Sequence, residues 1–182
     1  MLAHLVAIVC LLLSGTAFTQ DTQPATEPTS EPTSQPATQP AVDAEAMLQR
    51  FAGTWTIEAE WADGSSLNGT NIYTPTLNGR AMRAETIITL PDGRQYQRYE
   101  GLMRADGDNT IKAYVMTFDG SFAEGTMQVV DADTVRNGFA NDDPIRETIT
   151  FNDDDTYAWI VEQKTDDGYT VIMNGLWTKQ PT

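Results

Sequence analysis

Short segments in which apolar and polar residues alternate fill most of the chain beyond residue 52. The segment 53–61 is the clearest, because every second position from Trp55 is apolar and the positions between are threonine or glutamate. This period of two predicts a β-strand with one buried face, and the Asp-Gly and Asn-Gly pairs between segments predict tight turns. Ten strands are expected, at 53–61, 67–73, 81–90, 95–103, 111–118, 122–130, 135–139, 145–151, 157–163 and 169–177.

One helix is expected before the strands. Residues 44–51 carry Met47, Leu48 and Phe51 at helical spacing, and Asp43 suits the N-terminal cap. Antiparallel strands joined by hairpins close most simply as an up-and-down barrel, which leaves no open sheet edge. The predicted fold is therefore all-β, an antiparallel up-and-down barrel of about ten strands with a short N-terminal helix. A β-sandwich is the alternative.

The N-terminal residues have the pattern of a signal peptide. Residues 5–13 form an apolar run, and small residues follow it up to Ala17. An uncleaved anchor is the alternative, but so short a run does not span the ~30 Å hydrocarbon core of a bilayer. We therefore expect cleavage after Ala17, a periplasmic or secreted protein, and no membrane span in the mature chain.

A proline repeat follows. Prolines recur at every fourth position from Pro24 to Pro40, among Thr, Ser, Glu, Gln and Ala, and no large apolar residue interrupts them. Such a segment cannot form a core and favours extended polyproline II, so it is either a spacer or an unselected disordered tail. The predicted organisation is a signal peptide at 1–17, a disordered Pro/Thr/Ser/Glu/Gln linker at 18–42 and a barrel domain at 43–182.

The composition excludes several kinds of function. With 26 acidic and 11 basic residues the net charge is −15, whereas nucleic-acid binding requires clustered Lys and Arg. The only His and Cys are His4 and Cys10, both in the predicted signal peptide. The mature chain would then lack the residues for a Ser-His-Asp or Cys-His nucleophile, a His-ligated haem, a His or Cys zinc site and a disulfide.

A Gly-x-Trp motif, Gly53 to Trp55, opens the first strand after the short helix, and Lys179 follows the last strand. This arrangement resembles the lipocalin-like (calycin) superfamily. More closely, 48–179 is similar to a bacterial exported domain family of unknown function, which shares the leading Gly-x-Trp and the repeated Asp-Gly hairpins. The resemblance implies a lipocalin-like barrel in which Gly53, Trp55 and Lys179 close one end, with Lys179 lying across Trp55. It implies no catalytic residue.

Two neighbouring strands, 81–90 and 95–103, combine charged and aromatic residues. If the faces that carry Arg83 and Arg98 point inward, these arginines and Tyr96 form a site for a carboxylate. If the faces point outward, the arginines pair with glutamates on neighbouring strands. The outward alternative is favoured, because charged side chains are rarely buried.

Methionine recurs in the predicted strands, and the faces opposite the arginines carry Met82, Tyr99 and Met103. A methionine-lined cavity suits a hydrophobic ligand of variable shape, and ordinary core filling is the alternative. The candidate ligand-binding residues are Arg83, Tyr96, Arg98, Tyr99, Met82, Met103 and Met116.

Other chemistry finds little support in the sequence. No acid–base pair can be chosen among the glutamates without knowing their separations. The acidic loops 106–109 and 153–155 lack EF-hand spacing and are typical of turns, so no metal site is predicted. Neither phosphate-binding glycine motif occurs, and no cofactor is expected. The glutamates within strands are Glu58, Glu60, Glu85, Glu100, Glu124, Glu147 and Glu162.

Three functions remain open. The first is an exported barrel that binds a small apolar or amphipathic molecule, which predicts an interior cavity. The second is a non-enzymatic interaction or structural domain on a Pro-rich spacer, with an unknown protein partner, which predicts a filled barrel and an exposed apolar patch. The third, less favoured, is a His-independent enzyme that uses Glu or Tyr, which predicts a buried Glu with a raised pKa.

Overall fold

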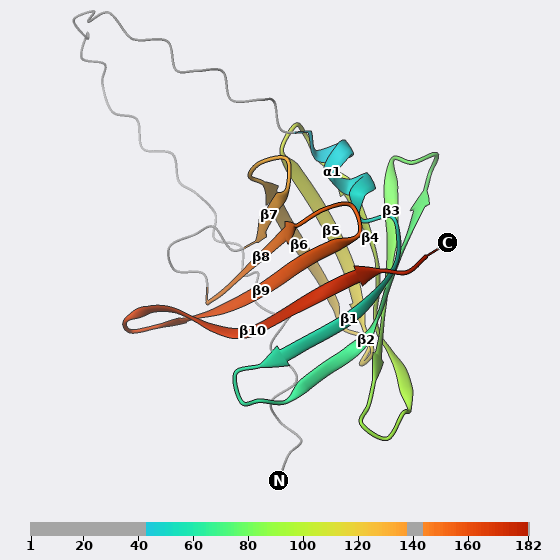
Figure 1. Cartoon of the computed structure of the whole chain (residues 1–182). Coiled ribbons are helices and arrows are strands. Elements are labelled where there is room, and N and C mark those ends of the chain that lie inside the picture. Colours follow the sequence, from blue (N-terminus) through green and yellow to red (C-terminus); the bar gives the residue numbers. More distant parts are fainter. Residues whose placement is uncertain (1–42, 138–143, 182) are drawn as a thin grey trace, which may run out of the picture.

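The computed structural model of the protein describes residues 43–137 and 144–181. Ten antiparallel strands form a closed barrel in which each strand pairs with its neighbours in the chain and β1 closes on β10 (Figure 1). The strands are β1 (Gly53–Trp61), β2 (Ser66–Thr76), β3 (Ala81–Thr89), β4 (Gln95–Ala105), β5 (Thr110–Thr117), β6 (Phe122–Val129), β7 (Thr134–Asn137), β8 (Ile145–Phe151), β9 (Thr156–Thr165) and β10 (Gly168–Lys179). The predicted all-β barrel is confirmed, and the β-sandwich is excluded because the sheet closes on itself.

Some expectations fall outside the described part of the chain. The signal peptide at 1–17 and the linker at 18–42 lie there, as does the end of the strand expected at 135–139. Within the described residues, no helix is long and apolar enough to cross a membrane.

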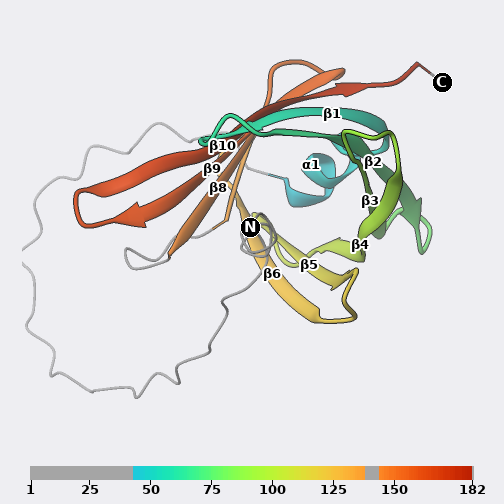
Figure 2. The same cartoon turned by 90° about the horizontal axis from the view of Figure 1, so that it is seen from below.

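The helix α1 (Ala44–Arg50) covers one end of the barrel and lies within the ring of strands in Figure 2. Asp43 caps it, because its Oδ1 accepts hydrogen bonds from the backbone N–H groups of Glu45 and Ala46 at 2.9 and 3.1 Å. The buried helix face carries Ala44, Met47 and Leu48. The helix therefore seals this end, which we call the sealed end.

Aromatic rings fill the barrel beneath the helix. The ring centroid of Phe51 lies 5.0 Å from that of Phe151 and 5.9 Å from that of Tyr157. Trp55 is fully buried, and its Nε1 donates a hydrogen bond to the backbone oxygen of Phe51 at 2.7 Å. This bond ties the helix end to the first strand and satisfies the indole N–H inside the core.

The three residues of the predicted closing motif meet at the sealed end. The Lys179 Nζ lies 5.3 Å from the ring centroid of Trp55, within cation–π range. Gly53 has φ +126°, and a Cβ there would lie 2.8 Å from Lys179 Cε. Glycine at this position therefore permits both the backbone turn and the passage of the lysine stem.

Candidate ligand-binding site in the barrel interior

Strand register shows which side chains enter the barrel, because directly paired residues share a face. Starting from buried Trp55, the inward positions can be followed around all ten strands. Near α1 these side chains are fully buried, whereas further away many keep accessible surface. We call the second region the distal half. Its inward, partly accessible residues include Tyr99, Ala113, Ala123, Gly125, Met127, Glu147 and Trp159.

Small side chains form one wall of the distal half. Ala113 of β5 pairs with Gly125 of β6, and Ala123 stands one inward position beyond Gly125. A Cβ built on Gly125 would meet nothing closer than the Cβ of Ala113, at 3.9 Å. A methyl group would therefore fit at Gly125, and the inward residues of this wall keep part of their surface accessible.

A β-bulge turns a charged side chain toward the interior. The pairing of β3 with β4 shifts between Thr86 and Ile87, which leaves Arg98 as an extra residue next to Tyr99. Arg98 is only 8% exposed. Its Nε donates to the Tyr99 hydroxyl at 2.7 Å, and its Nη1 donates to the Tyr96 hydroxyl at 3.3 Å. The bulge therefore assembles an inward group of one arginine and two tyrosines.

The electrostatics of this group keep the arginine charged. Burial by itself lowers the pKa of Arg98, but the Tyr99 and Tyr96 hydroxyls raise it, and the net pKa shift is upward. The guanidinium also lies 5.1 Å from the ring centroid of Tyr99, a cation–π distance. The distal half therefore holds a fixed positive charge.

Two of the candidate ligand-binding residues, Arg83 and Met116, lie outside the barrel, so neither binds a ligand in the interior. The favoured outward alternative is thus right for Arg83 and wrong for Arg98, which the bulge turns inward. The Arg83 Nη2 lies 2.9 Å from Glu100 Oε1 and 3.3 Å from Glu85 Oε2, in an exposed cluster on the outer face. Met116 is 53% exposed. Strand alternation carries both side chains away from the interior, so neither can line it.

The other two methionines point inward but lie in packed core. Met82 is fully buried and Met103 is 7% exposed, and the two face each other across β3 and β4. Both methionines belong to the hydrophobic core cluster that includes Leu48 of the helix. Of the residues expected to bind a ligand, the structure brings together Tyr96, Arg98 and Tyr99.

Glu147 is an interior acid that sequence reasoning did not single out. It lies on β8, paired with Asn137 of β7 and Val161 of β9, and it points inward. Within the described residues its carboxylate forms no hydrogen bond or ion pair, and the residue keeps part of its surface accessible. Burial raises its pKa to about 7. In the sequence it is one of seven glutamates within the expected strands, and only the strand register distinguishes it from those that point outward.

The interior also holds polar atoms without partners. Asn71 is 2% exposed, and its Nδ2 donates to the Tyr73 hydroxyl at 3.0 Å. Its Oδ1 has no partner in the described chain, and neither do the indole N–H groups of Trp159 and Trp177, whose ring centroids are 5.1 Å apart. An unmet buried polar group costs about 1–3 kcal/mol. Asn71 and Trp177 lie in the packed core, whereas Trp159 stands beside the distal half.

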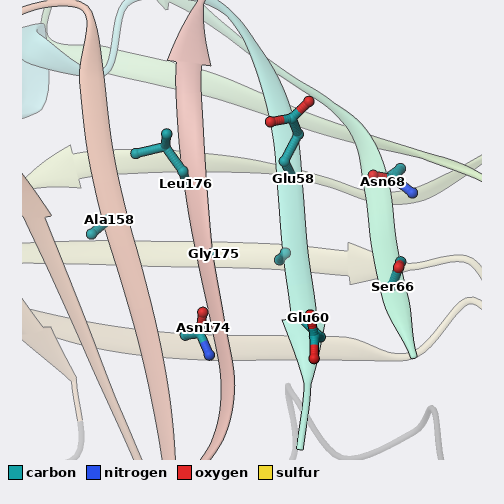
Figure 3. A pocket seen from close by; sticks show the side chains of 9 residues that line it. Glu58, Glu60, Ser66, Asn68, Ala158, Asn174, Gly175 and Leu176 are labelled. Carbon is teal, nitrogen blue, oxygen red and sulfur yellow. The ribbon is translucent and has the colours of Figure 1, made fainter. Parts of the chain in front are cut away.

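A separate hollow of about 550 Å³ lies on the outer face of β1, β2, β9 and β10 (Figure 3). It is shallow and open, and Glu58, Glu60, Asn68 and Leu176 on its floor face solvent. No group of three or more His, Cys, Asp or Glu suited to a metal ion occurs in the described part of the chain. The interior, with its inward charges and its accessible wall of small side chains, is the candidate site.

These features define the class of protein as a closed ten-stranded antiparallel β-barrel with a helix over one end. A scan against protein-family models finds no match, and a search of curated proteins finds none.

A search of solved structures returns other β-barrels at low similarity. A redesigned β-barrel matches with a TM-score of 0.44 and 15% identity, over 78% of this chain and 99% of that chain. A redesigned barrel, mFAP1, bound to DFHBI matches with a TM-score of 0.41 and 17% identity, over 72% and 97%. An S-type phycobiliprotein lyase from Guillardia theta matches with a TM-score of 0.44 and 12% identity, over 78% and 94%. The fold assignment rests on the strand order of this chain itself.

Proposed function

We propose that this protein binds one small amphipathic organic molecule inside the barrel, in the distal half. The observation that carries the proposal is the accessible inward surface of the distal half, where a Cβ built on Gly125 would meet no atom closer than Ala113 Cβ at 3.9 Å. Interiors of folded proteins are close-packed, so an inward position with room beside it is suited to a ligand.

The chemistry of the walls supports an amphipathic rather than a purely apolar ligand. Trp159 and Met127 offer apolar surface. Arg98 with its two tyrosines, and Glu147 on β8, offer charged and hydrogen-bonding groups that face the same interior. A few convergent polar groups among apolar ones are typical of small-molecule sites.

The same proposal includes export. It is supported by the apolar run 5–13 and the small residues up to Ala17, which match a signal peptide. In an exported carrier, the proline-repeat segment would act as a spacer that precedes the barrel.

An enzyme is the second candidate, and Glu147 is the observation that favours it. A carboxyl group with a pKa near 7 has the property expected of a general acid or base. A two-carboxylate mechanism also needs a second acid facing the first, and the inward positions of the described strands hold no other carboxylate. Mass spectrometry of the recovered ligand distinguishes the two, because an enzyme changes it and a carrier returns it intact.

The interaction-domain alternative finds one matching feature, an apolar patch on the outer face of β4, β5 and β6. Leu102 is 46% exposed, Met116 53% and Phe122 68%, and Tyr114 stacks on Phe122. That hypothesis also requires a filled barrel, and the accessible inward surface of the distal half argues against it.

The experiment compares the full chain with two single variants in titrations of 1-anilinonaphthalene-8-sulfonate, a small amphipathic fluorophore. Gly125→Phe fills the interior, and Thr126→Phe adds the same ring to the outer face of the same strand. We expect Gly125→Phe to weaken binding tenfold or more while Thr126→Phe leaves it unchanged. Equal binding by all three folded proteins would overturn the proposal, because the fluorophore would then sit on the outer patch.

A further inference from the structure

We propose that the ligand this barrel prefers is an organic amine, whose ammonium group pairs with the Glu147 carboxylate while its apolar part lies in the distal half near Trp159. This inference rests on the proposed function, because it names the chemical class of ligand for the same interior site. Its evidence is the position of Glu147, the absence of a partner for it within the described residues, and the surfaces beside it.

The direction of the Glu147 side chain follows from pairing on both sides of its strand. Opposite it stand Asn137 on β7 and Val161 on β9, and Val161 is fully buried. The charged neighbours Arg146 and Glu162 occupy the alternate, outward positions, and the Arg146 guanidinium lies 3.5 Å from the ring centroid of Tyr169. The sheet therefore separates the inward Glu147 from the outward charges of Arg146 and Glu162.

No cation of the described chain neutralises Glu147. The inward groups on the neighbouring strands are uncharged: Asn137 on β7, Trp159 and Val161 on β9, and Met173 on β10. Across the barrel, β4 presents Arg98 with its tyrosines, while Lys179 lies over Trp55 at the sealed end. Neither cation forms an ion pair with Glu147 among the described residues, and burial is the cause of the raised pKa of Glu147.

An ionised carboxylate in a protein interior is costly until a cation pairs with it. An ammonium group supplies that charge together with hydrogen-bond donors, and charge-assisted bonds are the strong ones. A divalent metal fits poorly, because Ca²⁺ requires six or more oxygen ligands and the described residues offer no cluster of acids.

The surface next to Glu147 favours an organic amine over a bare ion. On β9, Trp159 stands one inward position from Val161, the residue opposite Glu147. Trp159 is partly accessible as a residue, and an indole face attracts an ammonium group. An amine with an aromatic or alkyl body can therefore bind the acid and the ring together.

Binding by this route depends on pH. The free carboxyl group of Glu147 has a pKa of about 7, so below that pH a proton occupies the acid and competes with the amine. The other described charged and titratable groups that face the interior are Arg98, Tyr96 and Tyr99 in the distal half, and Tyr73, Tyr157 and Lys179 nearer the sealed end. Glu147 is the one carboxylate among these described inward groups.

The test uses three naphthalene probes of similar size on the full chain by isothermal titration calorimetry: 1-naphthylmethylamine, 1-naphthylmethanol and 1-naphthylacetate. At pH 8 we expect the amine to bind roughly tenfold or more tightly than the alcohol. Glu147→Gln should abolish that preference and keep alcohol binding, which also shows that the variant is folded. Glu162→Gln, an outward substitution with the same change in net charge, should retain the preference. At pH 5.5 the preference should shrink in the unmodified chain.

Two results would overturn the inference in different ways. If the amine and the alcohol bind equally at pH 8, or if Glu147→Gln keeps the preference, Glu147 is not the anchor. The proposed function survives in that case when Gly125→Phe still blocks the alcohol. If none of the three probes binds and Gly125→Phe changes nothing, the proposed function itself fails.

Discussion

The Nε of Arg98 donates a hydrogen bond to the hydroxyl of Tyr99, the next residue in the chain, at 2.7 Å. Adjacent residues of a regular strand point to opposite faces, so this bond exists because the β-bulge in β4 places both side chains on the inner side. The bulge brings into the barrel a positive charge that simple alternation would leave on the surface beside Glu100.

Arg98→Lys should lower the free energy of unfolding by about 1–3 kcal/mol. A lysine cannot donate both of the hydrogen bonds that the Arg98 guanidinium gives to the Tyr96 and Tyr99 hydroxyls. These partly buried hydroxyls would then lack a donor. Urea unfolding measures the difference. Arg83→Lys is the matched control, since its exposed ion pairs contribute at most about 1 kcal/mol. Equal losses in the two variants would contradict the interior role of Arg98.

Gly101→Ala should destabilise the barrel by about 1–3 kcal/mol or more. A Cβ at this inward position would overlap the backbone oxygen of Tyr114, which no rotamer change can relieve. Gly125→Ala has room for its methyl group, with the nearest atom at 3.9 Å, and should be close to neutral. The pair separates steric overlap from the general cost of replacing strand glycine, and thermal unfolding of both variants gives the comparison.

Glu147→Gln should make the protein more stable above neutral pH. The pKa of Glu147 in the folded protein is raised to about 7 from the ordinary value of 4.5. As the pH rises, the unfolded chain therefore loses this proton at a lower pH than the folded protein does. The protonated acid gives its full stabilisation below pH 4.5, and that stabilisation is lost by pH 7 and above. The variant, which stays neutral, should gain roughly 2–3 kcal/mol over the original chain at pH 8.

Urea unfolding at pH 4 and pH 8 tests this pH dependence. The two proteins should differ little at pH 4 and clearly at pH 8. A constant difference at both values would show that the carboxyl group ionises normally in the folded barrel.

Arg50→Ala should loosen the helix over the sealed end. Its Nη1 donates to Ala132 O at 2.6 Å and to Asp133 Oδ1 at 2.7 Å, and its guanidinium lies 4.4 Å from the Phe151 ring centroid. Loss of these contacts should cost about 1–3 kcal/mol and speed amide exchange in α1. Arg94→Ala, in an exposed turn, should change stability by less than about 0.5 kcal/mol. Unchanged exchange in α1 would contradict the anchoring role.

Local patterns along the chain were enough to predict the barrel. The alternation from Trp55 to Trp61 correctly marks the inner face of β1, because period-two patterning records which side of a strand is buried. Asp-Gly and Asn-Gly pairs mark hairpins such as the one at Gly79, where φ is +82°. The helical spacing after Asp43 likewise predicts α1 within one residue of its end.

The candidate site was predicted only in part. Sequence alternation groups Arg98 with Glu100 on one face and Tyr99 on the other, whereas the structure turns Arg98 and Tyr99 inward together. A bulge depends on the hydrogen bonding between two strands, and no residue type in β4 predicts its position. The sequence also shows Glu147 as one acid among seven, since its burial depends on strands that are distant in the chain.

By itself, then, the sequence determined the strands, their turns and the capping helix, because these depend on residues that are close together in the chain. It also determined the acidic composition of the predicted mature chain and its lack of His and Cys, because these depend only on residue counts. The tertiary structure alone decided where the interior is filled by Phe51 and Trp55 and where inward residues such as Gly125 keep accessible surface. It also decided which charges face inward. The physical reason is that closure and register bring together residues far apart in the chain, and a shift of one residue reverses every face beyond it.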